Sequence, residues 1–390
     1  MKIHTVKSGE TLYGIAKAHG TTYTSLAEIN GLKKPDRLTV GKELLILTPT
    51  RTYTTAPNDT LERISRRFGL TKTELLKNNP SLLGSEKLHT GMTLSLKYDT
   101  PAKGSAIAHG YAFGACSKER LSLFLPFLSY ASIGAYRTES GRIVRGFDDS
   151  ETVKRCKDSG CAPLMRIYDT RDANTAEKES ARFIEQIKEI AKKSGYNGVT
   201  LGAYGYSRDE RYESLICYYR DSLHRDGLIL FCEADANGKV GYENESDGCI
   251  LCYEKAQLEN PPSFSEGEAA ALDDYAKGCE ARQAFIDLSP FAYVNGRQIG
   301  KNEAEEFALN KGQDIITDEK RGICRILCGG KGENAVFESM KNTKAKLELI
   351  SELGFRGVSF DIMRTPIYDL MMAAASFYLG TDYFSSSLPM

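Results

Sequence analysis

The stretch Gly9-Glu10-Thr11-Leu12 determines how the first quarter of this 390-residue chain folds, because it returns 49 residues later as Asn58-Asp59-Thr60-Leu61. The positions that follow repeat in the same order. Ile15, Leu26 and Asn30 return as Ile64, Leu75 and Asn79, and Leu38 and Gly41 return as Leu88 and Gly91. Several matches at one offset indicate an internal duplication.

Each copy predicts the order strand, helix, helix, strand within about 45 residues. In the first copy Leu12, Ile15 and Ala16 have helical spacing, and Gly20-Thr21-Thr22 ends that helix. A second helix carries Leu26 and Ile29, which we expect to be core residues. Asn58 replaces Gly9 in the second copy, and both residue types tolerate a positive φ, so we expect the turn to be retained.

These motifs resemble the LysM family across almost all of residues 4–97. The resemblance predicts a module at residues 1–48, a second at 51–97 and a linker at 98–105. It also implies binding of β-1,4-linked N-acetylglucosamine, as in peptidoglycan or chitin, through backbone amides of a shallow groove between two loops. Two such grooves on one chain would raise avidity for a repeating polymer. The implied groove residues are Gly9, Glu10, Thr11, Leu12, Leu38 and Gly41, and then Asn58, Asp59, Thr60, Leu61, Leu88 and Gly91.

The net charge of −1 hides an uneven distribution. Residues 1–100 hold 15 Lys and Arg against 9 Asp and Glu, whereas the remainder holds 36 against 43. A basic N-terminal part favours a polyanionic matrix such as a bacterial wall over a neutral partner, although six charges on two small domains can also be simply solvated. Nothing in the sequence indicates nucleic-acid binding.

Membrane insertion and classical secretion are not indicated. No apolar run reaches the roughly 18–20 residues of a membrane helix. Met1-Lys2-Ile3-His4 leads directly into the first repeat without the apolar segment of a signal peptide. We therefore expect synthesis in the cytoplasm.

All ten cysteines lie beyond residue 115, and we expect them to be reduced. Cys249 and Cys252 have CxxC spacing, but they lie in an apolar run typical of a buried strand, so their thiols would point to opposite faces. The other close pairs lack a zinc-like arrangement with histidine. We predict no metal and no other cofactor.

From residue 106 to 390, apolar strands alternate with amphipathic helices. Helices are clearest at 175–193, 209–226, 265–279 and 341–353. Eight strands with helices between them predict a (β/α)₈ barrel, with a doubly wound sheet as the alternative, and residues of about 290–340 predict a small α+β insertion. The expected strands are 107–113, 127–133, 162–168, 198–203, 228–232, 249–253, 283–288 and 357–360.

Several of these segments resemble glycoside hydrolase family 18, and in particular the LysM-bearing cortex-lytic N-acetylglucosaminidases of bacterial spores. Leu128 to Ile133 is similar to their second strand, Ala162 to Met165 to the third, Tyr253-Glu254 to the end of the sixth, and Lys346 to Phe360 to the final helix and strand. The resemblance implies catalysis at the end of the fourth strand by the pattern D-G-x-x-x-D-x-E. The last Glu is the general acid, and the middle Asp positions the N-acetyl group that acts as nucleophile.

The acidic residues of that pattern are absent. Aligned on Gly198, the chain has Asn197 at the first Asp, Gly202 at the middle Asp and Tyr204 at the catalytic Glu. A phenol with a pKa of about 10 is a poor acid for a glycosidic oxygen. Asp361 stands where the family usually places a tryptophan, and this chain contains none. We therefore expect the barrel to be catalytically inactive.

Relocated acids are the alternative. Glu233, Glu254 and Asp361 follow or end expected strands and would face the mouth of the barrel, where barrel enzymes hold their chemistry. Each can equally be a solvated or ion-paired carboxylate, and His109 near the same face can be structural. The predicted cleft residues are Tyr111, Tyr204, Tyr253, Glu254 and Asp361.

The sequence is consistent with three functions. The first is a wall-glycan or spore-glycan binding protein with an inactive barrel, located in the spore coat, cortex or cell wall and made in the mother cell if the organism forms spores. The second is an active peptidoglycan N-acetylglucosaminidase or chitinase-like enzyme that uses relocated acids. The third is an assembly protein whose LysM grooves bind other proteins, such as those of the spore coat.

Overall fold

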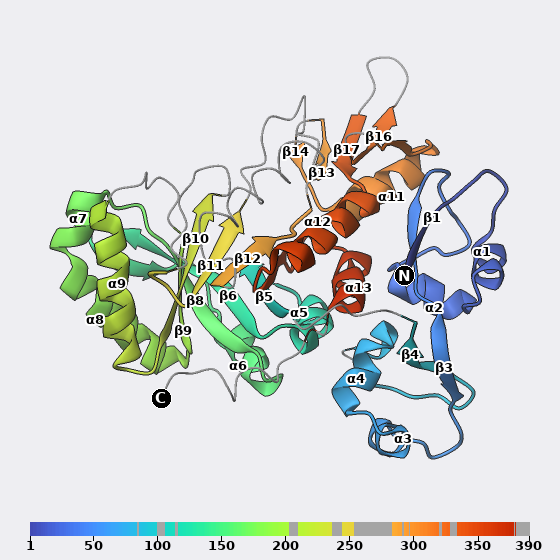
Figure 1. Cartoon of the computed structure of the whole chain (residues 1–390), viewed down its shortest axis with the longest axis horizontal. Helices are drawn as coiled ribbons and strands as arrows, with labels where there is room; N and C mark the ends of the chain where they lie inside the picture. Colours follow the sequence, from blue (N-terminus) through green and yellow to red (C-terminus); the bar gives the residue numbers. More distant parts are fainter. Residues whose placement is uncertain are drawn as a thin grey trace.

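The chain forms two small N-terminal modules, a barrel and an insertion within the barrel, as seen in a computed structural model (Figure 1). The N-terminal modules lie together beside the insertion and the C-terminal helix α13. The structure describes residues 1–83, 86–99, 106–113, 116–202, 210–235, 244–252, 283–290, 292–295, 297–319, 322–327, 334–377 and 379.

Both N-terminal modules have the predicted strand–helix–helix–strand order. In each, two antiparallel strands pair and two short helices cover them. Module 1 consists of β1 (Lys2–Thr5), α1 (Leu12–Ala18), α2 (Tyr23–Ile29) and β2 (Glu43–Ile46). Module 2 consists of β3 (Pro49–Thr54), α3 (Leu61–Phe68), α4 (Lys72–Lys77), a 3₁₀ turn (Pro80–Leu82) and β4 (Thr93–Tyr98).

Threonines begin all four helices of the modules. The side chain of Thr11 accepts a hydrogen bond from the amide of Gly14, and Thr60 does the same for Arg63. Thr22 and Thr71 cap the second helix of each module in the same way. Such caps satisfy amides that a helix cannot pair internally, so the repeated threonines fix where the helices begin.

The turn before the first helix also follows the prediction. Gly9 has a φ of 80° and Asn58 a φ of 66°. Asparagine is one of the few residues with a side chain that adopts this conformation readily, so the substitution leaves the turn unchanged.

The barrel is closed, which excludes the doubly wound alternative. The sheet order runs β5-β18-β12-β11-β10-β9-β8-β6, and β6 pairs back with β5. All eight predicted strands are present. They are β5 (Ile107–Phe113), β6 (Tyr130–Glu139), β8 (Ala162–Tyr168), β9 (Gly198–Gly202), β10 (Ile229–Asp235), β11 (Gly248–Cys252), β12 (Ala284–Asp287) and β18 (Gly357–Asp361).

The second strand differs most from its prediction. It begins at Tyr130, because Leu125–Phe127 forms a 3₁₀ turn, and it extends to Glu139. Beyond the barrel it pairs with β7 (Arg142–Arg145) as an antiparallel hairpin. This hairpin was not predicted, since its residues are mostly polar or charged.

The helices agree in part with the prediction. The expected helix 175–193 is divided at Glu179 into α7 (Ala173–Lys178) and α8 (Ser180–Ser194). The helices expected at 209–226 and 341–353 are α9 (Glu210–His224) and α12 (Met340–Leu353). The expected helix 265–279 lies outside the described residues. Three helices were not predicted, namely α5 (Lys118–Phe124), α6 (Ser150–Asp158) and α13 (Ile367–Ser376).

In its described residues, the predicted α+β insertion is a five-stranded sheet with one helix. Its sheet order is β14-β13-β17-β16-β15, and α11 (Lys301–Lys311) packs against it around Ala304 and Ala308. The strands are β13 (Ala292–Val294), β14 (Arg297–Gln298), β15 (Ile316–Asp318), β16 (Ile323–Leu327) and β17 (Asn334–Glu338).

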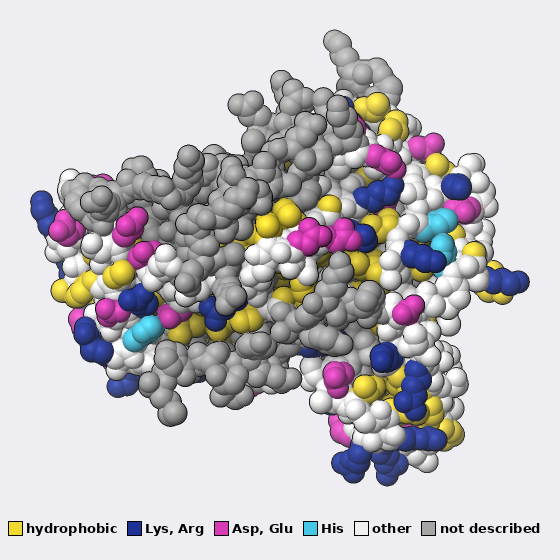
Figure 2. Space-filling view, in the orientation of Figure 1, with side chains coloured by type: hydrophobic (Ala, Val, Ile, Leu, Met, Phe, Trp, Pro, Cys, Tyr) yellow, Lys and Arg dark blue, Asp and Glu magenta, His cyan; other side chains and the backbone are white. Residues whose placement is uncertain are grey.

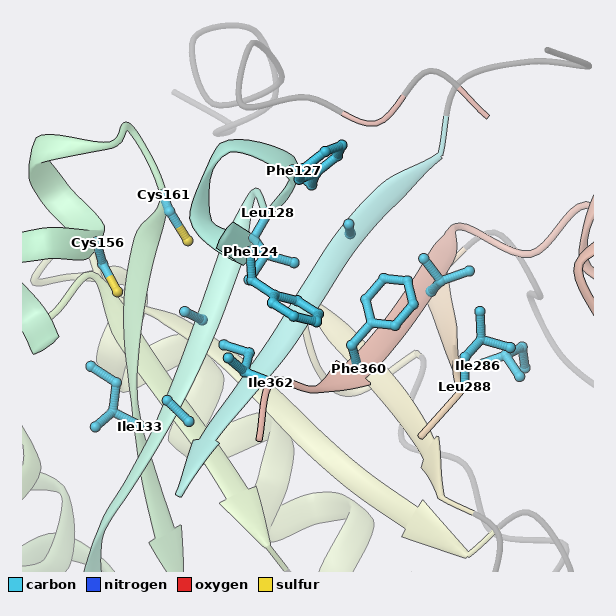
Figure 3. Packing of buried hydrophobic residues seen from close by; sticks show 14 of the residues in the cluster. Phe124, Phe127, Leu128, Ile133, Cys156, Cys161, Ile286, Leu288, Phe360 and Ile362 are labelled. Carbon is cyan, nitrogen blue, oxygen red and sulfur yellow. The ribbon is translucent and has the colours of Figure 1, made fainter. Parts of the chain in front are cut away.

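One large core fills the layer between the barrel strands and their helices. Phe124 of the segment after β5 packs beside Phe360 of β18, as Figure 3 shows, and Phe127 belongs to the same cluster. Module residues Ile29, Leu45, Leu47 and Tyr98 belong to the same core. Tyr98, which we expected to begin a linker, instead ends β4 and is buried there. Among the described residues, no helix is both long and apolar enough to cross a membrane.

Candidate grooves and barrel mouth

The acidic residue of each predicted groove fastens the turn that carries it. The carboxylate of Glu10 accepts hydrogen bonds from the amide of Lys7 and from His4 Nε2, both at 2.8 Å. Asp59 accepts from the amide of Ala56 at 2.7 Å and from the hydroxyl of Tyr53 at 2.8 Å. In both cases the backbone hydrogen bond is the main reason why the carboxyl pKa is lowered. These acids hold the loop in shape.

The remaining residues of the first loop also have structural roles. Thr11 and Thr60 are helix caps, and Leu12 and Leu61 are buried in their module cores. Gly9 and Asn58 are exposed and supply the left-handed turn. What the first loop presents to a ligand is therefore backbone, which agrees with the amide recognition that the LysM resemblance implies.

The second loop is built alike in both modules. Gly41 and Gly91 have φ angles of 83° and 86°, and each amide donates to the end of the first strand, at Val6 and Thr55 respectively, at 2.8 Å. Leu38 and Leu88 are partly buried against their modules. The two loops differ in their surroundings, because Gly41 is buried and Gly91 is exposed.

A salt bridge occupies the barrel where the catalytic motif of family 18 would lie. Arg166 of β8 donates to Glu233 of β10 through Nε (2.5 Å to Oε1) and Nη2 (2.7 Å to Oε2). Both side chains are largely buried, at 11% and 3% exposed. In a bidentate pair of this kind both oxygens of the carboxylate accept hydrogen bonds from the guanidinium. Glu233 is thus a structural partner of Arg166.

Gly202 lies on the strand between these two partners. A methyl group added to Gly202 would lie 3.0 Å from Arg166 Nη2 and 3.0 Å from Glu233 Oε2. From the sequence, the resemblance to family 18 predicts the middle Asp of the pattern at Gly202. The salt bridge therefore fills the space in front of the missing side chain.

Aromatic residues of β5 cover this pair. Arg166 lies 5.0 Å from the ring centre of Phe113 and 5.7 Å from that of Tyr111, and the two rings stack at 5.3 Å. Tyr111, a predicted cleft residue, is buried, whereas Phe113 is 37% exposed. Arg166 and Phe113 were not predicted from the sequence. Arg166 could have been found, because a single arginine interrupts an otherwise apolar strand.

The side chain of Asp361 forms hydrogen bonds within the turn that follows β18. Its Oδ1 accepts the amides of Met363 and Arg364 at 2.9 and 3.3 Å. Its own amide donates to Ser289 Oγ at 2.7 Å. This geometry is that of a turn-forming aspartate, and it accounts for an acid at this position without catalysis.

His109 lies deeper in the barrel within a polar layer. Its ring nitrogens contact Ser359 Oγ at 2.8 Å and Ser132 Oγ at 2.7 Å, and Ser132 contacts Thr200 at 2.5 Å. Complete burial, together with the charge of Arg166, lowers the pKa of His109 to about 3. The structure thus places this histidine in the interior and not at the mouth.

Three predicted cleft residues, Tyr204, Tyr253 and Glu254, lie outside the described residues, so their roles stay predictions. Cys249 and Cys252 face different clusters, as expected for alternating strand residues. Among the described residues, no group of His, Cys, Asp and Glu side chains is arranged to hold a metal ion.

Comparison with known proteins bears on both parts of the chain. The model of the LysM domain matches residues 4–47 and 53–97, so the two N-terminal modules are LysM domains. The cell wall-binding protein YocH of Bacillus subtilis is 36% identical over 107 residues, which cover 26% of this chain and 36% of YocH.

Two further proteins are similar to larger parts of the chain, at lower sequence identity. A Bacillus subtilis protein named as a putative sporulation-specific glycosylase, YdhD, is 24% identical over 277 residues. That match covers 65% of this chain, and the chain spans 64% of the length of YdhD. The spore cortex-lytic enzyme SleL of Bacillus cereus has a TM-score of 0.71 at 19% identity, covering 96% of this chain and 98% of that one. The modules and the barrel thus share one overall fold with SleL.

Proposed function

We propose that this protein binds N-acetylglucosamine-containing wall glycan through its LysM domains and that its barrel does not hydrolyse the glycan. The LysM domains supply preformed turns that present backbone, and YocH, which is similar to this chain over 107 residues, is named for cell-wall binding. Both YdhD and SleL are named for sporulation or the spore cortex, which supports a location in the spore envelope. Peptidoglycan is the favoured ligand over chitin, because the N-terminal part of the chain is basic.

The observation that carries the inactive barrel is the Arg166–Glu233 pair in front of Gly202. The middle Asp of the family pattern would have to share this space with a charged pair already bonded at 2.5 and 2.7 Å. Glu233 cannot donate a proton to a sugar while both of its oxygens accept from a guanidinium. Asp361 is likewise engaged by two backbone amides. Two of the three relocated acids are therefore poor candidates.

The test uses the purified full-length chain with insoluble peptidoglycan, spore cortex fragments and chitooligosaccharides. We expect the protein to sediment with peptidoglycan while no N-acetylglucosamine or new reducing ends are released. Measurable release would support the glycosidase alternative. The variant E254Q then becomes decisive, because it removes the remaining candidate acid, and loss of release without loss of fold would assign catalysis to Glu254.

A competition experiment addresses the assembly-protein alternative. Free chitotetraose should displace the chain from peptidoglycan if the grooves recognise sugar. Retention in the presence of excess chitotetraose would point to another ligand for the LysM domains.

A further inference from the structure

The two LysM domains differ in what covers their second loop. In module 1 the loop at residues 38–41 lies against the barrel insertion, and Thr39 is only 8% exposed. In module 2 the matching residues His89, Thr90 and Gly91 are all exposed. The predicted groove of each module lies between its first and second loops. The insertion therefore covers part of the groove of module 1 and leaves the groove of module 2 open.

Backbone contacts seal the covered loop. The amide of Ile315, in the insertion, donates to the carbonyl oxygen of Val40 at 2.9 Å. A methyl group added to Gly41 would lie 1.7 Å from the carbonyl oxygen of Ile315, whereas nothing lies within 4 Å of the same group at Gly91. The insertion thus takes the place beside Gly41 that is open beside Gly91.

Buried charges hold module 1 in this position. Lys42, next to the loop, bonds Glu305 of α11 at 2.5 Å, and the hydroxyl of Tyr368 donates to the other oxygen of Glu305 at 2.8 Å. The adjacent Glu43 accepts from the amide of Met340 at 2.5 Å. Separating such groups leaves charges without partners in a partly buried surface, which is costly. The covered state is therefore the ground state of the chain.

Module 2 contacts the rest of the molecule on the side of α4 and not through its groove loops. Its α4 contributes Lys77, whose Nζ donates to the carbonyl of Leu379 at 2.6 Å and lies over the ring of Phe127. Both of its groove loops point away from that contact, since Pro57, Asn58, Thr90 and Gly91 are exposed. In Figure 2 this module projects from the body of the molecule and carries several basic side chains.

We propose that module 2 alone binds the glycan and that module 1, packed on the barrel insertion, has a structural role. This inference rests on the proposed glycan binding. Each chain then has a single glycan-binding site with the affinity of one module, in place of the avidity expected from two grooves.

Matched substitutions in the first loops test the proposal. Ser8 and Pro57 are equivalent, exposed positions in the two modules, so we compare S8W and P57W in the full-length chain against insoluble peptidoglycan. P57W should weaken binding about tenfold or more, and S8W should leave it within about twofold of the native chain. T90W, in the exposed second loop of module 2, should behave like P57W.

The outcomes separate this inference from the proposed function. If both modules bound glycan, blocking either would remove the avidity gain of about 10²-fold, so equal losses in S8W and P57W would overturn the inference. Failure of the native chain itself to sediment with peptidoglycan would overturn the proposed function. Circular dichroism and thermal unfolding of each variant establish that the fold is retained.

Discussion

At the barrel mouth, the Arg166–Glu233 pair occupies the space in front of Gly202. Gly202 has no side chain on the middle strand, and the two flanking strands place opposite charges in front of it. The pair is buried, so its two charges depend on each other far more than exposed charges would.

We expect Glu233→Gln to act on stability. The substitution removes the charge of Glu233 from the pair with Arg166, and removing one partner of a buried pair costs about 3–5 kcal/mol. Urea unfolding monitored by circular dichroism measures the loss. Glu177→Gln is the matched control, because Glu177 is exposed on α7 and its replacement should be neutral. Equal stability of the two variants would contradict the structural role of Glu233.

His109 makes stability depend on pH. The unfolded chain binds a proton on this histidine below pH 6.5, whereas the folded chain binds it only near the lowered pKa of about 3. The contribution of His109 is therefore complete above pH 6.5 and falls by about 1.4 kcal/mol for each pH unit below it. His109→Asn should be less stable than the native chain at pH 7.5, and the gap should narrow by about 2 kcal/mol at pH 5. Parallel unfolding curves at both pH values would contradict this account.

Among the secondary-structure elements, repeated buried asparagines join helix to strand in each LysM domain. Asn30 Nδ2 donates to Leu26 and Leu45 carbonyls at 2.9 Å, and its Oδ1 accepts from the Leu45 amide at 2.7 Å. Asn79 makes the equivalent three bonds to Leu75 and Ser95. The asparagine of the repeated motif thus supplies hydrogen bonds to buried backbone groups of its own helix and of the facing strand.

Asn79→Ala should unfold module 2. Each buried backbone group left without a partner costs about 1–3 kcal/mol, and the substitution affects three of them. Hydrogen exchange over residues 51–97 and sedimentation with peptidoglycan are the measurements, and both should show loss. Thr54→Ala, on an exposed site of β3, is the control. Native exchange rates in the Asn79→Ala chain would show that these bonds are dispensable.

The sequence predicted elements whose signal is local and missed those that depend on distant partners. All eight barrel strands carry apolar runs that identify them directly. The helix α13 was missed, since Ile367–Ser376 is apolar on nearly all sides and becomes intelligible only where it is buried against α12 and module 1. Likewise the pairing of Arg166 with Glu233 joins residues 67 positions apart, and the covering of Gly41 depends on Ile315, far along the chain in the insertion. Spacing along the chain does not report such contacts.

Across the whole molecule, Lys42 links module 1 to the barrel insertion. Lys42→Met leaves Glu305 buried without its cation and should lower the stability of the junction. We expect a lower thermal midpoint and faster proteolysis between module 2 and the barrel. The double variant Lys42→Met with Glu305→Gln should recover part of the loss, because it removes both charges. Lys17→Met, on an exposed site of the same module, is the control and should have the thermal midpoint and proteolysis rate of the native chain. Native values of both in Lys42→Met would contradict the role of the Lys42–Glu305 pair.

The junction also determines how force travels through the molecule. Only two residues separate β2 from β3, and the amide of Asp99 donates to Thr48 at this point, so force on module 2 passes into module 1 as well as into the contacts of Lys77 with Leu379 and Phe127. In module 1 the load meets Lys42 and Glu43, which share it between α11 and the start of α12. A chain bound to a glycan strand through module 2 would hold its barrel at a constant distance and angle from that strand. The barrel would therefore move together with the strand.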